Sequence, residues 1–211
     1  MSNNRRSLIG LAIAIVLPVF GLAWYAERIP GLNPLLGREG FWWGLVLIVL
    51  LYVRVVERRP LSTIGFKRLT GKSVLWGIAG GIAILTFAGL SIIILLPLLH
   101  LKQNAQALSA LVAMPLWYKV AIVFRAAICE EVLFRGYGIE RLQELSGSRF
   151  VAGLVTLALF TVGHLSHWGW AQLIVAGAAG LVLTVLYLWQ RDLGANMIAH
   201  WITDAVGVLL Q

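Results

Sequence analysis

Residues 129–135 read Cys-Glu-Glu-Val-Leu-Phe-Arg and place ionisable side chains inside a strongly apolar part of the chain. A charged group at membrane depth costs several kcal/mol unless it is paired or lies in a wet cavity. On an α-helix, Glu131 and Arg135 lie one turn apart on one face and can form an ion pair. Glu130 projects about 100° away, at about 3.6 residues per turn, and has no partner on its own helix. An unpaired, desolvated glutamate beside an ion pair is typical of a general base.

A second apolar segment carries His164, and its distance from the intervening turn matches that of Glu130. If the hairpin pivots at Gly147, each of the two residues lies 17 positions from the pivot. Both then lie about 25 Å along antiparallel helices, at a rise of about 1.5 Å per residue. A carboxylate and an imidazole at one height can together hold and deprotonate a water molecule.

A third apolar segment carries His200 and Asp204, one turn apart on one face. His200 can donate a hydrogen bond to a carbonyl oxygen that becomes an oxyanion. Asp204 is either protonated or orients His200 from behind, because an ionised carboxylate only accepts hydrogen bonds. We expect the second. This set of residues predicts hydrolysis of a peptide bond near the cytoplasmic half of the bilayer, with no serine or cysteine nucleophile.

Each of these residues has a plainer interpretation when it is taken alone. A single histidine often only links two membrane helices, and a Glu–Arg pair is frequently structural. So many costly polar groups on three successive apolar segments nevertheless favour a shared polar cavity. His167 is expected at the membrane interface beside Trp168. Arg125 is expected to project about 140° from Glu130, at about 3.6 residues per turn, and to extend outward without a role.

The composition indicates an integral membrane protein. The 211 residues are 60% hydrophobic and 12% charged, with a mean hydropathy of +0.87; a soluble domain carries about a quarter charged residues. The net charge of +8 is assigned to loops that set topology and contact anionic lipid, with no nucleic-acid partner. The single cysteine, Cys129, excludes an internal disulfide.

The predicted fold class is all-α, a polytopic bundle of about seven transmembrane helices in one membrane domain, 1–211. Residues 100–115 form either a short interfacial helix or a plain connector, and residues 191–194 form a loop. Residues 1–115 hold the N-terminal spans and connectors, and residues 116–210 hold the catalytic core. The seven predicted spans are 8–26, 40–56, 74–99, 116–145, 150–165, 170–189 and 195–210.

The basic residues predict the orientation. With a cytoplasmic N-terminus and an outer C-terminus, the outer side holds only Arg28, Arg38, Lys102 and Lys119. This asymmetry follows the positive-inside rule, and we expect a bacterial plasma membrane. The basic residues on the inner side are then Arg5, Arg6, Arg54, Arg58, Arg59, Lys67, Arg68, Lys72, Arg141, Arg149 and Arg191.

Three short motifs on these segments resemble those of a known family, the CAAX-protease and bacteriocin-processing (CPBP or ABI) intramembrane proteases, which includes the Ras-converting CAAX endopeptidase. The family motifs EExxxR, FxxxH and HxxxN or a close variant occur here in order, from residue 116 to 210. The resemblance implies that Glu130 and His164 activate water and that His200 and Asp204 form the oxyanion side. It also implies supporting roles for three residues, Glu131, Arg135 and Phe160.

The sequence departs from the family pattern at Asp204, where asparagine is more usual. We expect no cofactor, although Glu130, His164 and His200 are residue types that can bind zinc; no HExxH spacing is present. The expected partner is a membrane-associated peptide or protein substrate. Two alternatives stay open at this point: a non-catalytic immunity or scaffold protein of the same fold, and a proton-coupled transporter.

Overall fold

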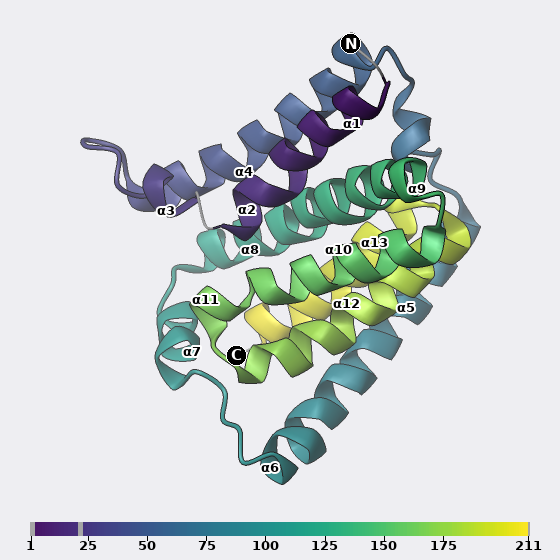
Figure 1. Cartoon of the computed structure of the whole chain (residues 1–211). Coiled ribbons are helices and arrows are strands. Elements are labelled where there is room, and N and C mark those ends of the chain that lie inside the picture. Colours follow the sequence, from purple (N-terminus) through teal and green to yellow (C-terminus); the bar gives the residue numbers. More distant parts are fainter. Residues whose placement is uncertain (1–2, 21–22, 211) are drawn as a thin grey trace.

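The computed structural model describes residues 3–20 and 23–210, and every regular element in these ranges is a helix. This confirms the predicted all-α class. Figure 1 shows the arrangement. In chain order the elements are α1 (Asn3–Leu11), η1 (Ala12–Val16), α2 (Leu17–Val19), α3 (Ala23–Ala26), α4 (Pro34–Leu51), η2 (Tyr52–Val56), η3 (Leu61–Ile64), α5 (Gly71–Leu90), η4 (Ser91–Leu95), α6 (Leu96–Leu98), α7 (Ala105–Val112), α8 (Leu116–Arg125), η5 (Ala126–Ile139), α9 (Glu140–Ser146), α10 (Arg149–Gly163), α11 (Leu165–Trp168), α12 (Ala171–Gln190), α13 (Leu193–Asp204) and η6 (Ala205–Leu209).

Four helices in the described ranges are long and apolar enough to cross a membrane. They are Pro34–Val56, Gly71–Leu98, Arg149–Trp168 and Ala171–Gln190. A fifth candidate is the pair Ala105–Val112 and Leu116–Ser146, bent by 116° at the break between them. The chain is therefore an integral membrane protein, as its composition predicts.

The first and last predicted spans correspond to shorter helices. One runs from Asn3 to Val19 and the other from Leu193 to Leu209, each a little under the roughly 18 residues that identify a spanning helix. Residues 21 and 22 of the first predicted span lie outside the described residues. The count of seven spans and the orientation stay predictions.

The long helix formed by α8, η5 and α9 runs through the middle of the bundle (Figure 1). Helices α1, α2 and α4 cover one side of it, while α10, α12, α13 and α5 lie on the other. Element η5 packs against η1, α4, α10 and α13. The N- and C-terminal ends of the described chain lie at opposite ends of the bundle.

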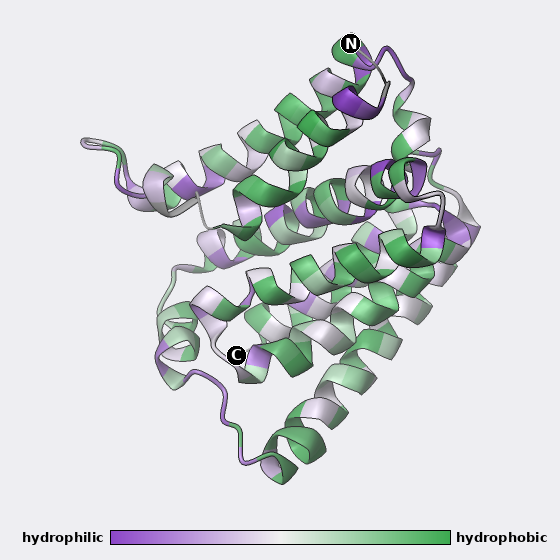
Figure 2. Ribbon diagram, viewed as in Figure 1, coloured by the Kyte–Doolittle hydropathy of each residue, from purple (hydrophilic) through white to green (hydrophobic). Residues whose placement is uncertain are grey.

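Hydrophilic residues are confined largely to the two ends of the bundle and to the central helix (Figure 2). Many large apolar side chains point outward, among them Ile93, Leu75 and Val185, which are 74%, 63% and 55% exposed. Such a surface matches lipid, because hydrocarbon replaces the protein core as the apolar environment. The polar side chains of the central helix are enclosed by its neighbours instead.

Close packing of α5 against α13 fixes the helix that carries His200. A Cβ atom at Gly77 would lie 2.6 Å from Cβ of Ile198, and one at Gly81 would lie 3.0 Å from Cβ of Ile202. Small residues spaced four apart allow two membrane helices to approach closely. The first turns of the two helices are also joined, because Ser73 Oγ donates to Asp192 Oδ2 at 2.7 Å.

Asp192 also determines where α13 begins. Its carboxylate accepts from the backbone N–H of Gly194 at 2.9 Å and acts as the N-cap. The helix therefore starts at Leu193, inside the region predicted as a loop. The segment 100–115, for which two interpretations were open, contains the eight-residue helix α7 capped by Asn104.

A buried ionic network joins the loop after η2 to the central helix at the end of the bundle that carries most basic residues. Arg141 is fully buried and donates from Nη2 to Glu57 Oε2 at 2.6 Å. Tyr137 Oη donates to Glu57 Oε1 at 2.7 Å. Arg141, which was predicted to lie on the inner side at the end of the span 116–145, is thus part of the interior, because a carboxylate from a distant loop compensates its charge.

Arg191 lies near the same end, in the turn before α13. It pairs with Glu140, and its Nε donates to Glu140 Oε1 at 3.0 Å. This hydrogen bond to a carboxylate is the main reason that the pKa of Arg191 is raised above its usual value. The turn is therefore tied to the first residue of α9.

Candidate functional site

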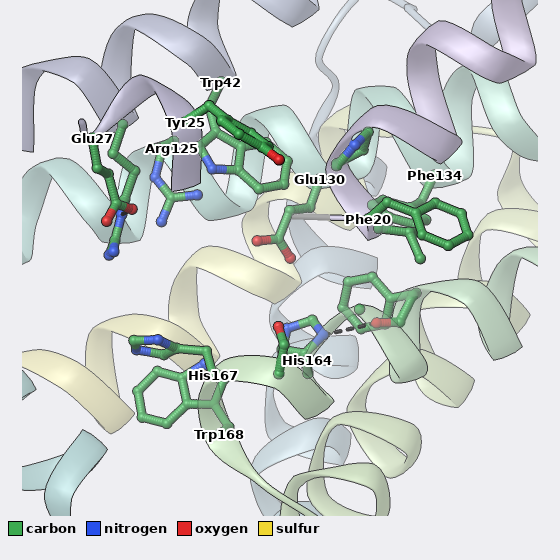
Figure 3. Close-up of a pocket in the computed structure, with 16 residues that line it drawn as sticks. Phe20, Tyr25, Glu27, Trp42, Arg125, Glu130, Phe134, His164, His167 and Trp168 are labelled. Atoms are coloured by element: carbon green, nitrogen blue, oxygen red, sulfur yellow. Dashed lines mark hydrogen bonds and ion pairs between the residues drawn. The ribbon is translucent and has the colours of Figure 1, made fainter. Parts of the chain in front are cut away.

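A cavity of about 600 Å³ opens where η5, α10 and the N-terminal helices meet, at the end of the bundle opposite Arg141 (Figure 3). Its wall combines aromatic rings with ionisable groups. The lining residues are Pro18, Val19, Phe20, Tyr25, Glu27, Arg38, Trp42, Arg125, Glu130, Phe134, Phe160, Gly163, His164, Ser166, His167 and Trp168.

Glu130 contributes an unpaired carboxylate to this cavity. Its side chain makes no hydrogen bond or ion pair with any of the described residues, although the residue is only 9% exposed. The neighbouring Glu131 is fully buried and fully engaged. The sequence predicted this division between the two glutamates, with one in an ion pair and the other without a partner.

His164 lies on the opposite wall, as the C-cap residue of α10. Its Nδ1 lies 2.8 Å from the carbonyl oxygen of Phe160. Because a carbonyl only accepts, Nδ1 carries the hydrogen in this contact, and Nε2 is the nitrogen that has a free lone pair in the neutral imidazole. Figure 3 shows the Glu130 carboxylate directed toward the His164 ring across the cavity. The structure therefore brings together the carboxylate and the imidazole that the sequence placed at one height.

A second polar group is centred on Glu131 and is completely enclosed. Arg135 Nη1 donates to Glu131 Oε1 at 2.9 Å, and His200 Nδ1 lies 2.8 Å from the same oxygen. Asn196 Nδ2 donates to Glu131 Oε2 at 3.1 Å. These four residues are named the Glu131 cluster below. A buried carboxylate with this many partners joins η5 to α13, because removal of any partner would leave a charge or a polar group unsatisfied.

His200 and Asp204 lie beside the cavity and do not form part of its lining. Nε2 of His200 is 3.4 Å from Asp204 Oδ2, and the Asp204 side chain is 28% exposed. Glu131, at 2.8 Å from Nδ1, is the closer of the two carboxylates. Glu131 therefore contacts the imidazole at the edge opposite Asp204, the residue that was expected to orient the ring.

The ring of Phe160 lies between the cavity and the Glu131 cluster. The guanidinium carbon of Arg135 is 4.1 Å from its centroid, and the ring of His164 is 4.7 Å away. The ring of His200 is 6.5 Å away. A guanidinium over an aromatic face is attracted by the ring quadrupole, so Phe160 is held by contacts with both groups.

The position of the Arg125 side chain differs from the one predicted from the sequence. Arg125 does not extend outward: it is only 8% exposed, lines the cavity, and donates from Nε to Glu39 Oε1 at 3.1 Å. The angle of about 140° assumed an α-helix with about 3.6 residues per turn, whereas the chain from residue 126 is a π-helix. In i→i+5 turns, residues five apart come closer to one face, so Arg125 and Glu130 reach the same cavity.

His167 also lines the cavity, beside Trp168. Sequence reasoning missed further residues of the site: Asn196, and the three charged residues Glu27, Arg38 and Glu39 from the N-terminal half. Asn196 was detectable, because it precedes His200 by four residues on an apolar helix and so shares its face. The other three come from the segment before and within α4, and no spacing relates them to the later motifs.

The donor set does not form a metal centre. Among residues 3–20 and 23–210, no three His, Cys, Asp or Glu side chains converge as metal ligands. A protein zinc site uses three or four such ligands, and Glu130 and His164 supply two.

Comparisons with known proteins agree with the site. Residues 112–206 match the model of the Rce1-like family, described as type II CAAX prenyl endopeptidase Rce1-like. A curated protein of Bacillus subtilis (strain 168), "Putative membrane peptidase YdiL", is 28% identical over 208 residues, covering 93% of this chain and 82% of its own length. No solved structure gives a significant match.

Both matches agree with the resemblance to the CAAX-protease and bacteriocin-processing family that is seen in the three motifs. They support a protease of the CAAX type in general, located in a membrane. The matched region begins just before α8 and contains every residue of the three motifs.

Proposed function

We propose that the chain is an intramembrane endopeptidase in which Glu130 and His164 activate the attacking water. The observation that carries this proposal is the pair of free acceptors on facing walls of one cavity. The Glu130 carboxylate has no partner among the described residues, and His164 Nε2 is left free by the Nδ1 contact. Two acceptors can take both hydrogens of one water, so that its lone pair points toward a peptide carbonyl.

In this mechanism Glu130 takes a proton as the water oxygen attacks the carbonyl carbon. The resulting tetrahedral intermediate collapses when the amine nitrogen receives that proton from Glu130 and leaves. The absence of a competing donor among the described residues supports this base role, because the carboxylate lone pairs remain available to the water proton. No step requires a covalent intermediate.

His200 is proposed as the oxyanion donor. Its Nδ1 lies 2.8 Å from Glu131 Oε1, so Nε2, which faces the partly exposed Asp204, would be the nitrogen that donates to the oxyanion. Preorganised donors of this kind stabilise the charge that develops on the carbonyl oxygen. Glu131, Arg135, Asn196 and Phe160 would act through His200 or His164 as positioning residues.

The test is Glu130→Gln, which keeps the size and polarity of the side chain and removes the base. Cleavage of a quenched fluorescent peptide library by the full chain in lipid nanodiscs should fall by about 10²–10⁴-fold, the range attributed to general-base catalysis. Glu144→Gln, which removes a carboxylate far from the cavity, should keep the activity. Undiminished cleavage by a folded Glu130→Gln variant would overturn the proposal, as would a wild-type chain that cleaves no peptide of the library.

A further inference from the structure

Two arginines of the cavity wall are each held by one nitrogen only. Arg125 Nε donates to Glu39 Oε1 at 3.1 Å, and Arg38 Nε donates to Glu27 Oε1 at 2.6 Å. The terminal NH2 groups of both side chains make no hydrogen bond to any of the described residues. An arginine offers five N–H donors in a planar fork, so most of its donor capacity is unused at both positions.

Arg125 is the more rigid of the two. Its side chain is 9% exposed, and its guanidinium carbon lies 5.3 Å from the centroid of the Trp42 ring. The second oxygen of Glu39, Oε2, is buried and makes no hydrogen bond, so the carboxylate restrains Nε without occupying the fork. Figure 3 shows the guanidinium directed into the space that the Glu130 carboxylate also faces.

Fixed, partly desolvated guanidinium forks recognise planar anions with two parallel hydrogen bonds, and a carboxylate has the matching geometry. The surrounding wall is aromatic, with Tyr25, Trp42 and Trp168. A ligand with an apolar body and one carboxylate would satisfy both features. A phosphate at this depth would bring about two negative charges toward Glu27 and Glu130, which disfavours it.

We propose that Arg125, assisted by Arg38 nearer the rim, forms a subsite for a carboxylate of the substrate. This inference rests on the proposed protease function, since it assigns the recognition of the peptide at the same cavity. The carboxylate belongs either to the free C-terminus of the peptide or to an acidic side chain. Both present the same chemistry to the fork.

The test measures binding, which does not require cleavage. Three N-acetylated apolar peptides derived from one parent sequence are titrated into the full chain in nanodiscs: one with a free C-terminal carboxylate, one amidated, and one amidated in which a single internal residue is replaced by glutamate. The wild-type chain should bind the free-carboxylate form about tenfold more tightly than the amide, as expected for a charge-assisted bidentate contact. Equal affinity of all three peptides would overturn the proposal.

The glutamate peptide separates the two sources of the carboxylate. Affinity equal to that of the free C-terminus assigns the subsite to any carboxylate, and affinity equal to that of the plain amide assigns it to the chain end. Arg125→Gln should abolish the preference of about tenfold. Lys102→Gln, which removes an exposed cation at the same end of the bundle but outside the cavity, should keep it. A preference that survives Arg125→Gln contradicts the proposal.

Arg125→Gln leaves the Glu39 charge uncompensated, so the double variant Arg125→Gln/Glu39→Gln is measured beside it. If neither of these variants folds, Arg125→Lys is measured instead, because lysine keeps the positive charge and lacks the planar guanidinium group. A carboxylate preference of about tenfold that is retained in this variant would contradict bidentate recognition. The same titration with the Glu130→Gln variant measures the carboxylate preference in a protein that should not cleave the peptides. It therefore tests the subsite independently of the protease mechanism. If the wild-type chain prefers the carboxylate but hydrolyses no peptide, the subsite is supported and the protease mechanism is contradicted. If it hydrolyses peptides without this preference, the protease mechanism is supported and the subsite is contradicted.

Discussion

At the scale of single residues, adjacent glutamates of one helix have opposite surroundings. Glu130 faces a cavity and has no partner in the described part of the chain, whereas Glu131 is enclosed by Arg135, Asn196 and His200. A general base in hydrolysis needs a carboxylate that is free to accept a proton. A carboxylate buried deep in a membrane bundle instead needs partners that compensate its charge. The free carboxylate of Glu130 thus suits the proposed chemistry, and the paired carboxylate of Glu131 suits a structural role.

This division predicts different effects on stability. Glu131→Gln removes the charge that compensates Arg135, which is 1% exposed, and should lower the free energy of unfolding by about 3–5 kcal/mol. Glu130→Gln breaks no contact and should change it by less than about 1 kcal/mol. Thermal unfolding of both variants in the same detergent measures the difference. Equal destabilisation by the two variants would contradict the assigned roles.

The sequence predicted the Glu131–Arg135 ion pair, because side chains four residues apart on a helix lie on the same face. It did not predict the environment of Arg125. That residue reaches the cavity through a π-helical stretch, and residue spacing alone does not show where a helix widens. The pairing of Arg38 with Glu27, across a turn of the N-terminal half, was equally outside the pattern.

At the scale of helices, the position of His200 depends on how closely α13 approaches α5. The glycines at positions 77 and 81 leave room for Ile198 and Ile202. The sequence predicted both helices within a few residues of their ends. It did not show that they pack together, because three other long helices, α8–η5–α9, α10 and α12, lie between them in the chain. Residue spacing within one helix carries no information about such a long-range contact.

A matched pair of glycine variants tests this packing. In Gly77→Ala the new Cβ would lie 2.6 Å from Ile198 Cβ and 3.0 Å from the Ala195 carbonyl oxygen, so α13 must move. We expect a loss of about 1–3 kcal/mol in the free energy of unfolding, together with reduced cleavage. Gly89→Ala, on the same helix with nothing within 4 Å, should be neutral or stabilising by up to about 1 kcal/mol. Thermal unfolding and peptide cleavage of both variants provide the measurement, and similar behaviour of the two would contradict the close packing of α5 and α13.

At the scale of the whole molecule, the cavity and the basic residues occupy opposite ends of the bundle. Glu27 and Arg38 line the cavity, whereas Arg141 and Arg191 lie at the other end. A cytoplasmic N-terminus would therefore place the opening of the cavity away from the cytoplasmic half of the bilayer, where cleavage was expected. If the positive-inside rule sets the topology, the cavity opens toward the outer face, and the basic end contacts anionic lipid of the inner leaflet.

Cysteine labelling of intact cells tests this orientation. Cys129 is fully buried and should not react with a membrane-impermeant maleimide. We expect Lys102→Cys, at the cavity end, to be labelled in intact cells, and Arg68→Cys, in the basic loop, to be labelled only after lysis. The unsubstituted chain is the control for background reaction. The reverse pattern would place the cavity on the cytoplasmic side and contradict the positive-inside assignment.

The ring of Phe160 has a consequence for proton movement. It contacts His164 on one side and Arg135 on the other, and no hydrogen bond between described residues connects the cavity with the Glu131 cluster. A hydrocarbon ring neither donates nor accepts a proton, so Phe160 itself relays no proton between Glu130 and the Glu131 cluster. Phe160 thus separates Glu131 and Arg135, which hold the bundle together, from the acid–base cycle proposed for Glu130, and His200 would be the residue that takes part in both.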